Sequence, residues 1–77
     1  MLKIKDDVDL YELEKFGFEI SEDEACKYYR YTTIKVISQT REIIIRLYGI
    51  PEWVKGELTA IYDLIQAGLV EKVGGEH

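Results

Sequence analysis

The sequence predicts an α+β fold: a short N-terminal helix, an antiparallel β-hairpin within a small sheet of two to four strands, and a C-terminal helix packed on one sheet face. Two observations support this prediction. Residues 27–48 are rich in β-branched and aromatic side chains and alternate in polarity, as strands with one buried face do. Between Val54 and Ile65, apolar residues recur at intervals of three and four, the spacing of one helix face. We expect residues 1–73 to form one domain and residues 74–77 a disordered tail.

The N-terminal helix is predicted from its capping residues and from the spacing of its apolar residues. Asp7 or Asp9 can accept hydrogen bonds from the free N–H groups of a first turn, and Gly17 can end the helix in the left-handed conformation. The apolar residues at helical spacing are Leu10, Leu13 and Phe16. Residues 21–24 are polar and are expected to form a loop, while residues 2–5 or 69–73 are expected to extend the sheet.

The hairpin is expected to join a strand within residues 27–38 to a strand within residues 41–48. When Ile37 pairs with Glu42, alternate residues of the two strands share the core face, namely Thr32, Ile34, Val36, Ile43, Ile45 and Leu47. The opposite, outer face then carries the candidate interaction residues, which are Tyr29, Tyr31, Lys35, Ile37, Ile44, Arg46 and Tyr48.

The C-terminal helix is expected to begin at Pro51, which suits a first helical position because its missing N–H is not needed there. Gly68 is expected to end the helix just after Ala67. Its apolar stripe comprises Val54, Leu58, Ile61, Leu64 and Ile65. We expect this stripe to pack against the core face of the hairpin at Ile34, Val36, Ile43, Ile45 and Leu47.

The composition argues against catalysis, cofactors and a membrane location. The chain of 77 residues has one cysteine and one histidine, so it forms no intrachain disulfide and offers no zinc cluster. The single imidazole, His77, lies in the predicted tail, and Cys26 follows acidic residues that disfavour a thiolate. No apolar run of 18 residues occurs. We therefore expect a cytoplasmic protein that is not an enzyme, has no cofactor or metal and does not enter a membrane.

The net charge of −5 conceals a segregation of charge along the chain. Residues 1–26 carry −6, residues 27–56 carry +4 and residues 57–77 carry −3. The basic segment coincides with the hairpin, where cations alternate with tyrosines. Basic groups attract phosphates and tyrosines stack on unpaired bases, so this pattern is compatible with single-stranded nucleic acid. The acidic first third suggests a different hypothesis, that the protein imitates the charge of DNA.

The outer face also has the composition of a protein-interaction surface. Its isoleucines and tyrosines would form a contiguous apolar patch, and such patches on small domains usually contact a partner or a second copy. Self-association would also enlarge the small core of a chain this short. We therefore predict binding of a protein partner through the outer face, with a homodimer as the expected assembly. Single-stranded nucleic-acid binding is the alternative, and coverage of this face by other segments is the simplest explanation without function.

Three segments of the chain resemble a group of small uncharacterised proteins encoded by phages and prophages of Gram-positive bacteria. They are IKDDVDLYELEKFGF at 4–18, TREI at 40–43 and IYDLIQAGLVEKV at 61–73. Together they cover about half of the chain. The resemblance implies a phage-type accessory protein that works in the host cytoplasm, and it implies no activity and no functional residues.

Overall fold

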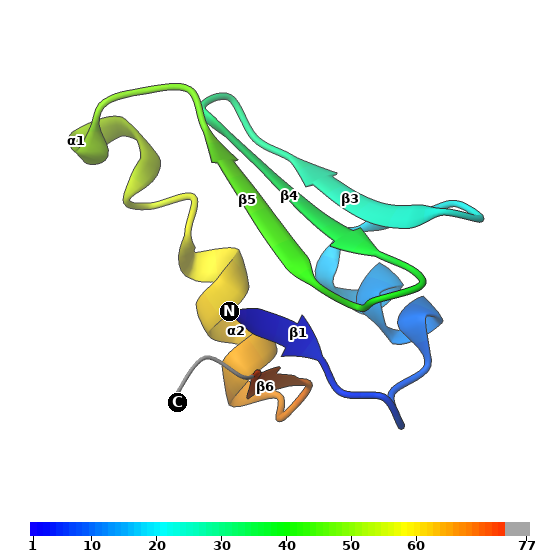
Figure 1. The fold of residues 1–77 in the computed structure, drawn as a ribbon. Helices are drawn as coiled ribbons and strands as arrows, with labels where there is room; N and C mark the ends of the chain where they lie inside the picture. Colours follow the sequence, from blue (N-terminus) through cyan, green and yellow to red (C-terminus); the bar gives the residue numbers. More distant parts are fainter. Residues whose placement is uncertain (74–77) are drawn as a thin grey trace.

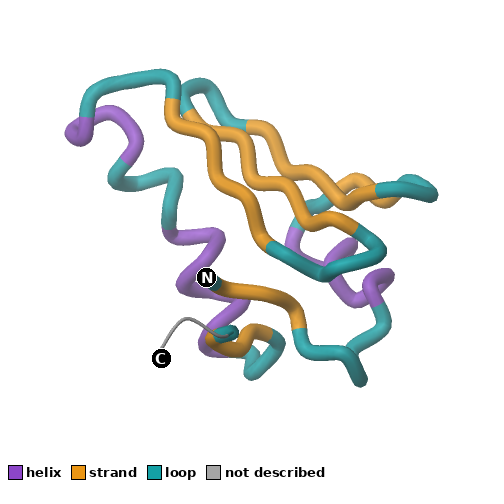
Figure 2. Tube along the Cα trace, viewed as in Figure 1, coloured by secondary structure: helices purple, strands orange, loops and turns teal. Residues whose placement is uncertain are grey.

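The computed structural model describes residues 1–73, which form two antiparallel sheets and three short helical segments (Figure 1). The predicted mixed α+β class is therefore confirmed. Figure 2 shows that the strands of the large sheet lie together on one side of the molecule, while the helical segments lie below and beside them. The predicted disorder of residues 74–77 falls outside the described residues.

The large sheet is a meander of four consecutive strands: β2 (Glu19–Ile20), β3 (Glu24–Tyr28), β4 (Thr32–Ile37) and β5 (Ile43–Leu47). Ile37 N–H donates to the Glu42 carbonyl at 3.0 Å, and Val36 lies opposite Ile43. The predicted register of the hairpin is therefore correct. It places one set of alternate side chains in the core, where the buried members of β4 and β5 are Thr32, Ile34, Val36 and Ile43.

The strand predicted within residues 27–38 does not extend through Tyr29 and Tyr31, so the predicted place of these two residues on the outer face is wrong. The chain reverses at residues 29–31, where Tyr29 N–H donates to the Thr32 carbonyl at 2.8 Å. The segment is therefore divided into β3 and β4, which pair with Tyr28 opposite Thr33. The expected loop at 21–24 is also shorter, because Glu24 already belongs to β3 and pairs with Ile37.

The strands expected near both ends of the chain exist, but they form a sheet of their own. β1 (Leu2–Ile4) pairs antiparallel with β6 (Val70–Lys72). This pair touches the large sheet through a single bridge between Lys3 and Glu42, beside which Ile4 N–H donates to the Arg41 carbonyl at 2.9 Å. Ile4 is fully buried, so β1 contributes to the core although it does not extend the large sheet.

The segment predicted as the N-terminal helix forms a 3₁₀ helix, η1 (Leu10–Phe16). Of the two proposed caps, Asp9 fulfils the role, because its side chain accepts the Tyr11 N–H at 2.9 Å. Gly17 ends the segment in the left-handed conformation with φ 89°. One apolar side chain of this helix, Leu13, is completely buried and joins the core.

The single C-terminal helix predicted from Pro51 to Ala67 is wrong, since the structure divides it into α1 (Pro51–Val54) and α2 (Thr59–Gln66). The interruption contains Gly56, whose carbonyl accepts a hydrogen bond from the Thr59 hydroxyl at 3.0 Å. Glycine is a poor helix former, which accounts for a break at this place in an otherwise helical spacing. Figure 1 shows α1 displaced from the axis of α2.

The interruption changes which apolar residues meet. Three residues of α2 lie in the core with β4 and β5, namely Ala60, Ile61 and Leu64. In contrast, Ile45 is 39% exposed, Leu47 54% and Ile65 46%. The predicted packing of the helical stripe on Ile45 and Leu47 is therefore wrong, because the part of the stripe that would cover them is displaced with α1.

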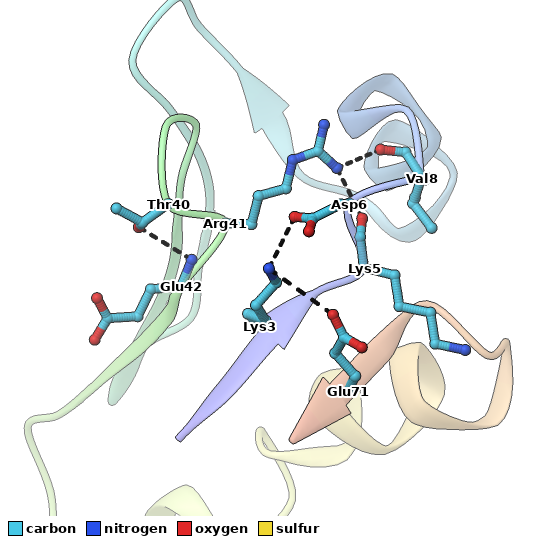
Figure 3. Close-up of polar contacts among 8 residues, drawn as sticks. All are labelled: Lys3, Lys5, Asp6, Val8, Thr40, Arg41, Glu42 and Glu71. Carbon is cyan, nitrogen blue, oxygen red and sulfur yellow. Dashed lines mark hydrogen bonds and ion pairs between the residues drawn. The ribbon is translucent and has the colours of Figure 1, made fainter. Parts of the chain in front are cut away.

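A polar cluster fastens the N-terminal segment to the β4–β5 turn (Figure 3). The Arg41 guanidinium donates to the Lys5 carbonyl at 2.9 Å and also to the Val8 carbonyl. Nearby, Lys3 Nζ lies 2.8 Å from the Asp6 carboxylate and 3.8 Å from that of Glu71. The hydrogen bond and charge of Lys3 hold the pKa of Asp6 below its usual range.

Candidate interaction surface

The outer face is the side of the large sheet opposite the buried cluster. Cross-strand pairing places on it the second set of alternate residues from β2 to β5, together with the residue that follows β5. These residues are Glu19, Glu24, Cys26, Tyr28, Thr33, Lys35, Ile37, Ile44, Arg46 and Tyr48. In Figure 1, η1, β1 and α2 lie below the large sheet, so within residues 1–73 these elements leave the outer face uncovered.

The centre of the outer face is hollowed. A shallow depression of about 430 Å³ crosses β3, β4 and β5 and is lined by Tyr28, Thr33, Lys35, Ile37, Ile44, Arg46 and Tyr48. Among the lining residues Thr33 is buried, Ile37 and Ile44 are half-buried, and the two tyrosines and Arg46 are exposed. Such a surface can contact an apolar group at its centre and polar groups at its margin.

Five of the seven predicted interaction residues therefore lie together, and two do not. Lys35, Ile37, Ile44, Arg46 and Tyr48 line the depression, whereas Tyr29 and Tyr31 belong to the β3–β4 turn. The Tyr29 side chain packs against the core. The Tyr31 ring lies against Trp53 of α1, with ring centroids 5.0 Å apart.

Two residues of the depression were missed by the sequence prediction, Tyr28 and Thr33. Thr33 lies on the predicted outer face but was not chosen as an interaction residue. Tyr28 falls on the core face when the strand is continued without a turn from Thr32 to Lys27, whereas the turn at 29–31 places it opposite Thr33 on the outer face. The available signal was length, since twelve residues exceed the usual strand of five or six.

The basic residues of the hairpin are distributed over both faces of the sheet. Lys27 lies on the core side, where its ammonium donates to the Phe16 carbonyl at 2.5 Å. Arg41 is engaged by the N-terminal segment, and the Arg30 guanidinium lies 5.3 Å from the centroid of the Tyr31 ring. Of the five cations in residues 27–48, Lys35 and Arg46 are left on the outer face.

The outer face is divided electrostatically into an acidic and a basic half. Glu19 and Glu24 lie on β2 and β3, while Lys35 and Arg46 lie on β4 and β5. Lys35 Nζ is 3.5 Å from a Glu24 carboxylate oxygen, which joins the two halves at the middle of the sheet. The exposed charges at the two margins are then Glu19 and Arg46, which have opposite signs.

Cys26 lies between these charges and is buried, with Sγ 3.3 Å from Glu24 Oε2. Burial raises the pKa of the Cys26 thiol, and the Glu24 carboxylate acts in the same direction, while the Tyr28 side chain opposes it. The thiol is therefore protonated near neutral pH and is a poor nucleophile.

In residues 1–73, no group of three or more His, Cys, Asp and Glu side chains is placed to hold a metal ion. Within that part of the chain, none of the helices has the length and apolar character needed to cross a membrane.

Comparison of the chain with protein-family models, with curated proteins and with solved structures finds no match.

Proposed function

We propose that this protein is a non-enzymatic accessory protein that acts by protein–protein interaction through the outer face, and that the partner this face fits best is a second copy of the chain. The observation that carries the proposal is the depression of about 430 Å³, whose lining includes two half-buried isoleucines and the exposed Tyr28, Tyr48 and Arg46. Tyrosine and arginine are enriched in protein interfaces relative to the rest of the protein surface. The phage-type origin implied by the sequence resemblance is part of this proposal and agrees with a small binding protein.

In this proposal, α2 and η1 cover the opposite face of the large sheet. Ala60 and Leu64 of α2 and Leu13 of η1 share one buried cluster with Ile34 and Val36 of β4. A partner is therefore expected on the outer face of this sheet.

A second copy is favoured by the division of charge. In a two-fold, face-to-face packing of two sheets, β4 and β5 of one copy lie over β2 and β3 of the other. Arg46 and Ile44 on β5 of each copy then approach β2 of the partner, which carries Glu19, while Ile37 on β4 lies over β3 of the partner. The two symmetry-related contacts between Arg46 and Glu19 are attractive because the outer face carries both signs of charge.

Single-stranded nucleic acid is the alternative and is supported less well. A nucleic-acid surface needs several free cations and several stacking rings on one face. Here Lys35 is paired with Glu24, and the outer face also carries Glu19, so it has no excess of positive charge. Tyr29 and Tyr31 lie elsewhere, which leaves Tyr28 and Tyr48 as the exposed rings.

The test is sedimentation equilibrium over a wide range of protein concentration. It compares the wild type with two charge-reversed variants, measured alone and mixed. Arg46→Glu alone and Glu19→Lys alone should each weaken the dimer by about tenfold, because each places two like-charge contacts across the interface. An equimolar mixture of the two variants should recover the wild-type affinity, since both contacts of the mixed dimer are then attractive. Ile44→Ser should weaken the dimer in every mixture.

Lys72→Glu is the matched control, because it reverses an exposed charge on β6, away from the outer face. It should leave the dimer unchanged. A monomer at all concentrations would overturn the homodimer. If that monomer also binds a mixed-sequence single-stranded oligonucleotide at low salt, and Arg46→Glu abolishes the binding, the nucleic-acid alternative replaces the proposal.

A further inference from the structure

The backbone of β5 has one paired side and one free side. Ile37 N–H donates to the Glu42 carbonyl at 3.0 Å, and Tyr48 N–H donates to the Tyr31 carbonyl at 2.8 Å. Even-numbered residues of this strand thus direct their N–H and C=O groups toward β4. Because these directions alternate along a strand, Ile45 and Leu47 direct theirs to the opposite side.

That side is open over the second half of the strand. β5 is the last strand of the large sheet, and the β1 bridge reaches no further than Glu42. Among residues 1–73, no backbone carbonyl on the side of β5 that faces away from β4 accepts a hydrogen bond from the N–H groups of Ile45 and Leu47. An unpaired strand edge is a template for another extended segment.

An apolar groove lies beside this edge. It has a volume of about 360 Å³ and lies between the end of β5 and the α1 region. It is lined by Leu47, Gly49, Pro51, Val54, Lys55 and Leu58. Ile45 of β5 and Trp53 of α1 are also exposed, at 39% and 52%. Lys55 provides the only charge in the lining.

We propose that the free edge of β5 binds an extended segment of a partner protein as a fifth strand, and that this segment alternates aliphatic and acidic residues. The free backbone groups of Ile45 and Leu47 require an extended chain with its own N–H and C=O groups available. Residues opposite Ile45 and Leu47 point to the groove, which selects aliphatic side chains.

The charges at the edge select the acidic residues of this segment. The residue opposite Arg46 points to the outer face, where a carboxylate can pair with the guanidinium. Lys55 at the groove favours a carboxylate in the flanking part of the segment. A second β5 does not meet these requirements, because antiparallel self-pairing centred on the free residues places Arg46 opposite Arg46, and like charges there are destabilising.

The test uses an acetylated and amidated peptide with the sequence Ser-Glu-Val-Glu-Val-Glu-Ser as the probe, with amide hydrogen exchange of the full chain measured by NMR. In the free protein, the amides of Ile45 and Leu47 should exchange much faster than those of Ile44 and Arg46. Saturating peptide should slow exchange at Ile45 and Leu47 by at least about tenfold. The same peptide N-methylated at both valines keeps its side chains but loses the donors, and it should give no protection.

Protein variants test the same contact from the other side. Leu47→Pro removes the edge donor, and this position tolerates proline because the Leu47 N–H does not serve the β4–β5 ladder. Leu47→Val is the matched control, since it keeps the backbone donor and an aliphatic side chain. Peptide protection at Ile45 should persist in Leu47→Val and disappear in Leu47→Pro, and Lys55→Glu should weaken it by about threefold to tenfold.

Three results would overturn the proposal. The first is slow exchange at Ile45 and Leu47 in dilute free protein, because the edge would then be covered by the chain itself. The second is protection that grows with protein concentration without peptide, which would identify a second copy as the occupant. The third is equal binding of the N-methylated peptide, which would show side-chain contact without strand pairing.

Because this site uses the β5 edge, Ile44→Ser and Glu19→Lys can abolish the outer-face dimer without removing peptide binding.

Discussion

The Arg41 guanidinium donates a hydrogen bond to the Lys5 carbonyl at 2.9 Å, across 36 positions of sequence (Figure 3). The same guanidinium also donates to Val8, so one side chain fastens the β4–β5 turn to the segment that leads from β1 to η1. The backbone of Arg41 has φ 66°, a left-handed conformation that non-glycine residues rarely adopt. The side-chain contacts and the unfavourable backbone thus act on stability in opposite directions at one residue.

The two effects at Arg41 can be separated by comparing alanine with glycine. Arg41→Ala loses the hydrogen bonds and keeps the unfavourable backbone, so it should lower the free energy of unfolding by about 2–3 kcal/mol. Arg41→Gly loses the same bonds but relieves the backbone, so it should be about 1 kcal/mol more stable than Arg41→Ala. Urea unfolding followed by circular dichroism measures both. Equal stability of the wild type and Arg41→Ala would show that the hydrogen bonds contribute nothing.

Two glycines in the α1 region should respond in opposite directions to the same substitution. A Cβ added at Gly49 would lie 2.9 Å from Trp53 Cε3 and 3.2 Å from the Tyr31 ring. The ring pair must therefore shift, and Gly49→Ala should destabilise the protein by about 1–3 kcal/mol. A Cβ added at Gly56 meets nothing within 4 Å, so Gly56→Ala should stabilise it by about 0.4–1 kcal/mol through reduced freedom of the unfolded chain.

The single tryptophan of the chain provides a second measurement for these glycine variants. Because Trp53 packs on Tyr31, Gly49→Ala should change the wavelength of its emission maximum in the folded protein, and Gly56→Ala should not. Thermal unfolding gives the two stability changes. The packing explanation would be contradicted by similar melting temperatures for the two variants or by an unchanged emission in Gly49→Ala.

The β4–β5 register was predictable from the sequence because its alternation has only one favourable pairing. A slip of one residue would move Ile34 and Val36 from the core to the outer face. The reversal at 29–31 was not predictable from local sequence, since Tyr29, Arg30 and Tyr31 are not turn-forming residues. This turn depends on distant groups: the Tyr31 N–H donates to the Glu57 carboxylate at 3.1 Å, and the Tyr31 ring packs on Trp53.

The exposure of Ile45 and Leu47 on β5 could not be predicted from the sequence for a related reason. The apolar spacing from Val54 to Ile65 fits one straight helix, and a straight helix would cover Ile45 and Leu47. The interruption at 55–58 shows in the sequence only as Gly56, a residue that many helices tolerate. The prediction of the candidate site had the same limit. Alternation along the strands placed five of its residues correctly on the outer face, whereas Tyr29 and Tyr31 were misplaced because the turn at 29–31 was not predicted.

Cys26 provides a prediction for the acidic half of the outer face. Burial is the main cause of its raised pKa, and the Glu24 carboxylate, with an oxygen 3.3 Å from Sγ, adds to it. Since the thiolate is the reactive form, the rate of alkylation by iodoacetamide should rise with pH and reach half its maximum above the ordinary thiol pKa of 9.0. The neighbouring Tyr28 side chain acts in the opposite direction and lowers the pKa.

Variants at these two neighbours should therefore move the alkylation midpoint in opposite directions. Glu24→Gln removes the negative charge beside the thiol, which favours the thiolate, so the midpoint should fall toward pH 9. Tyr28→Phe removes the stabilising hydroxyl, so the midpoint should rise above that of the wild type. Circular dichroism at each pH excludes unfolding as the cause of reactivity. A wild-type midpoint at or below 9, or movement of both variants in the same direction, would show that the surroundings of Cys26 do not control its ionisation in this way.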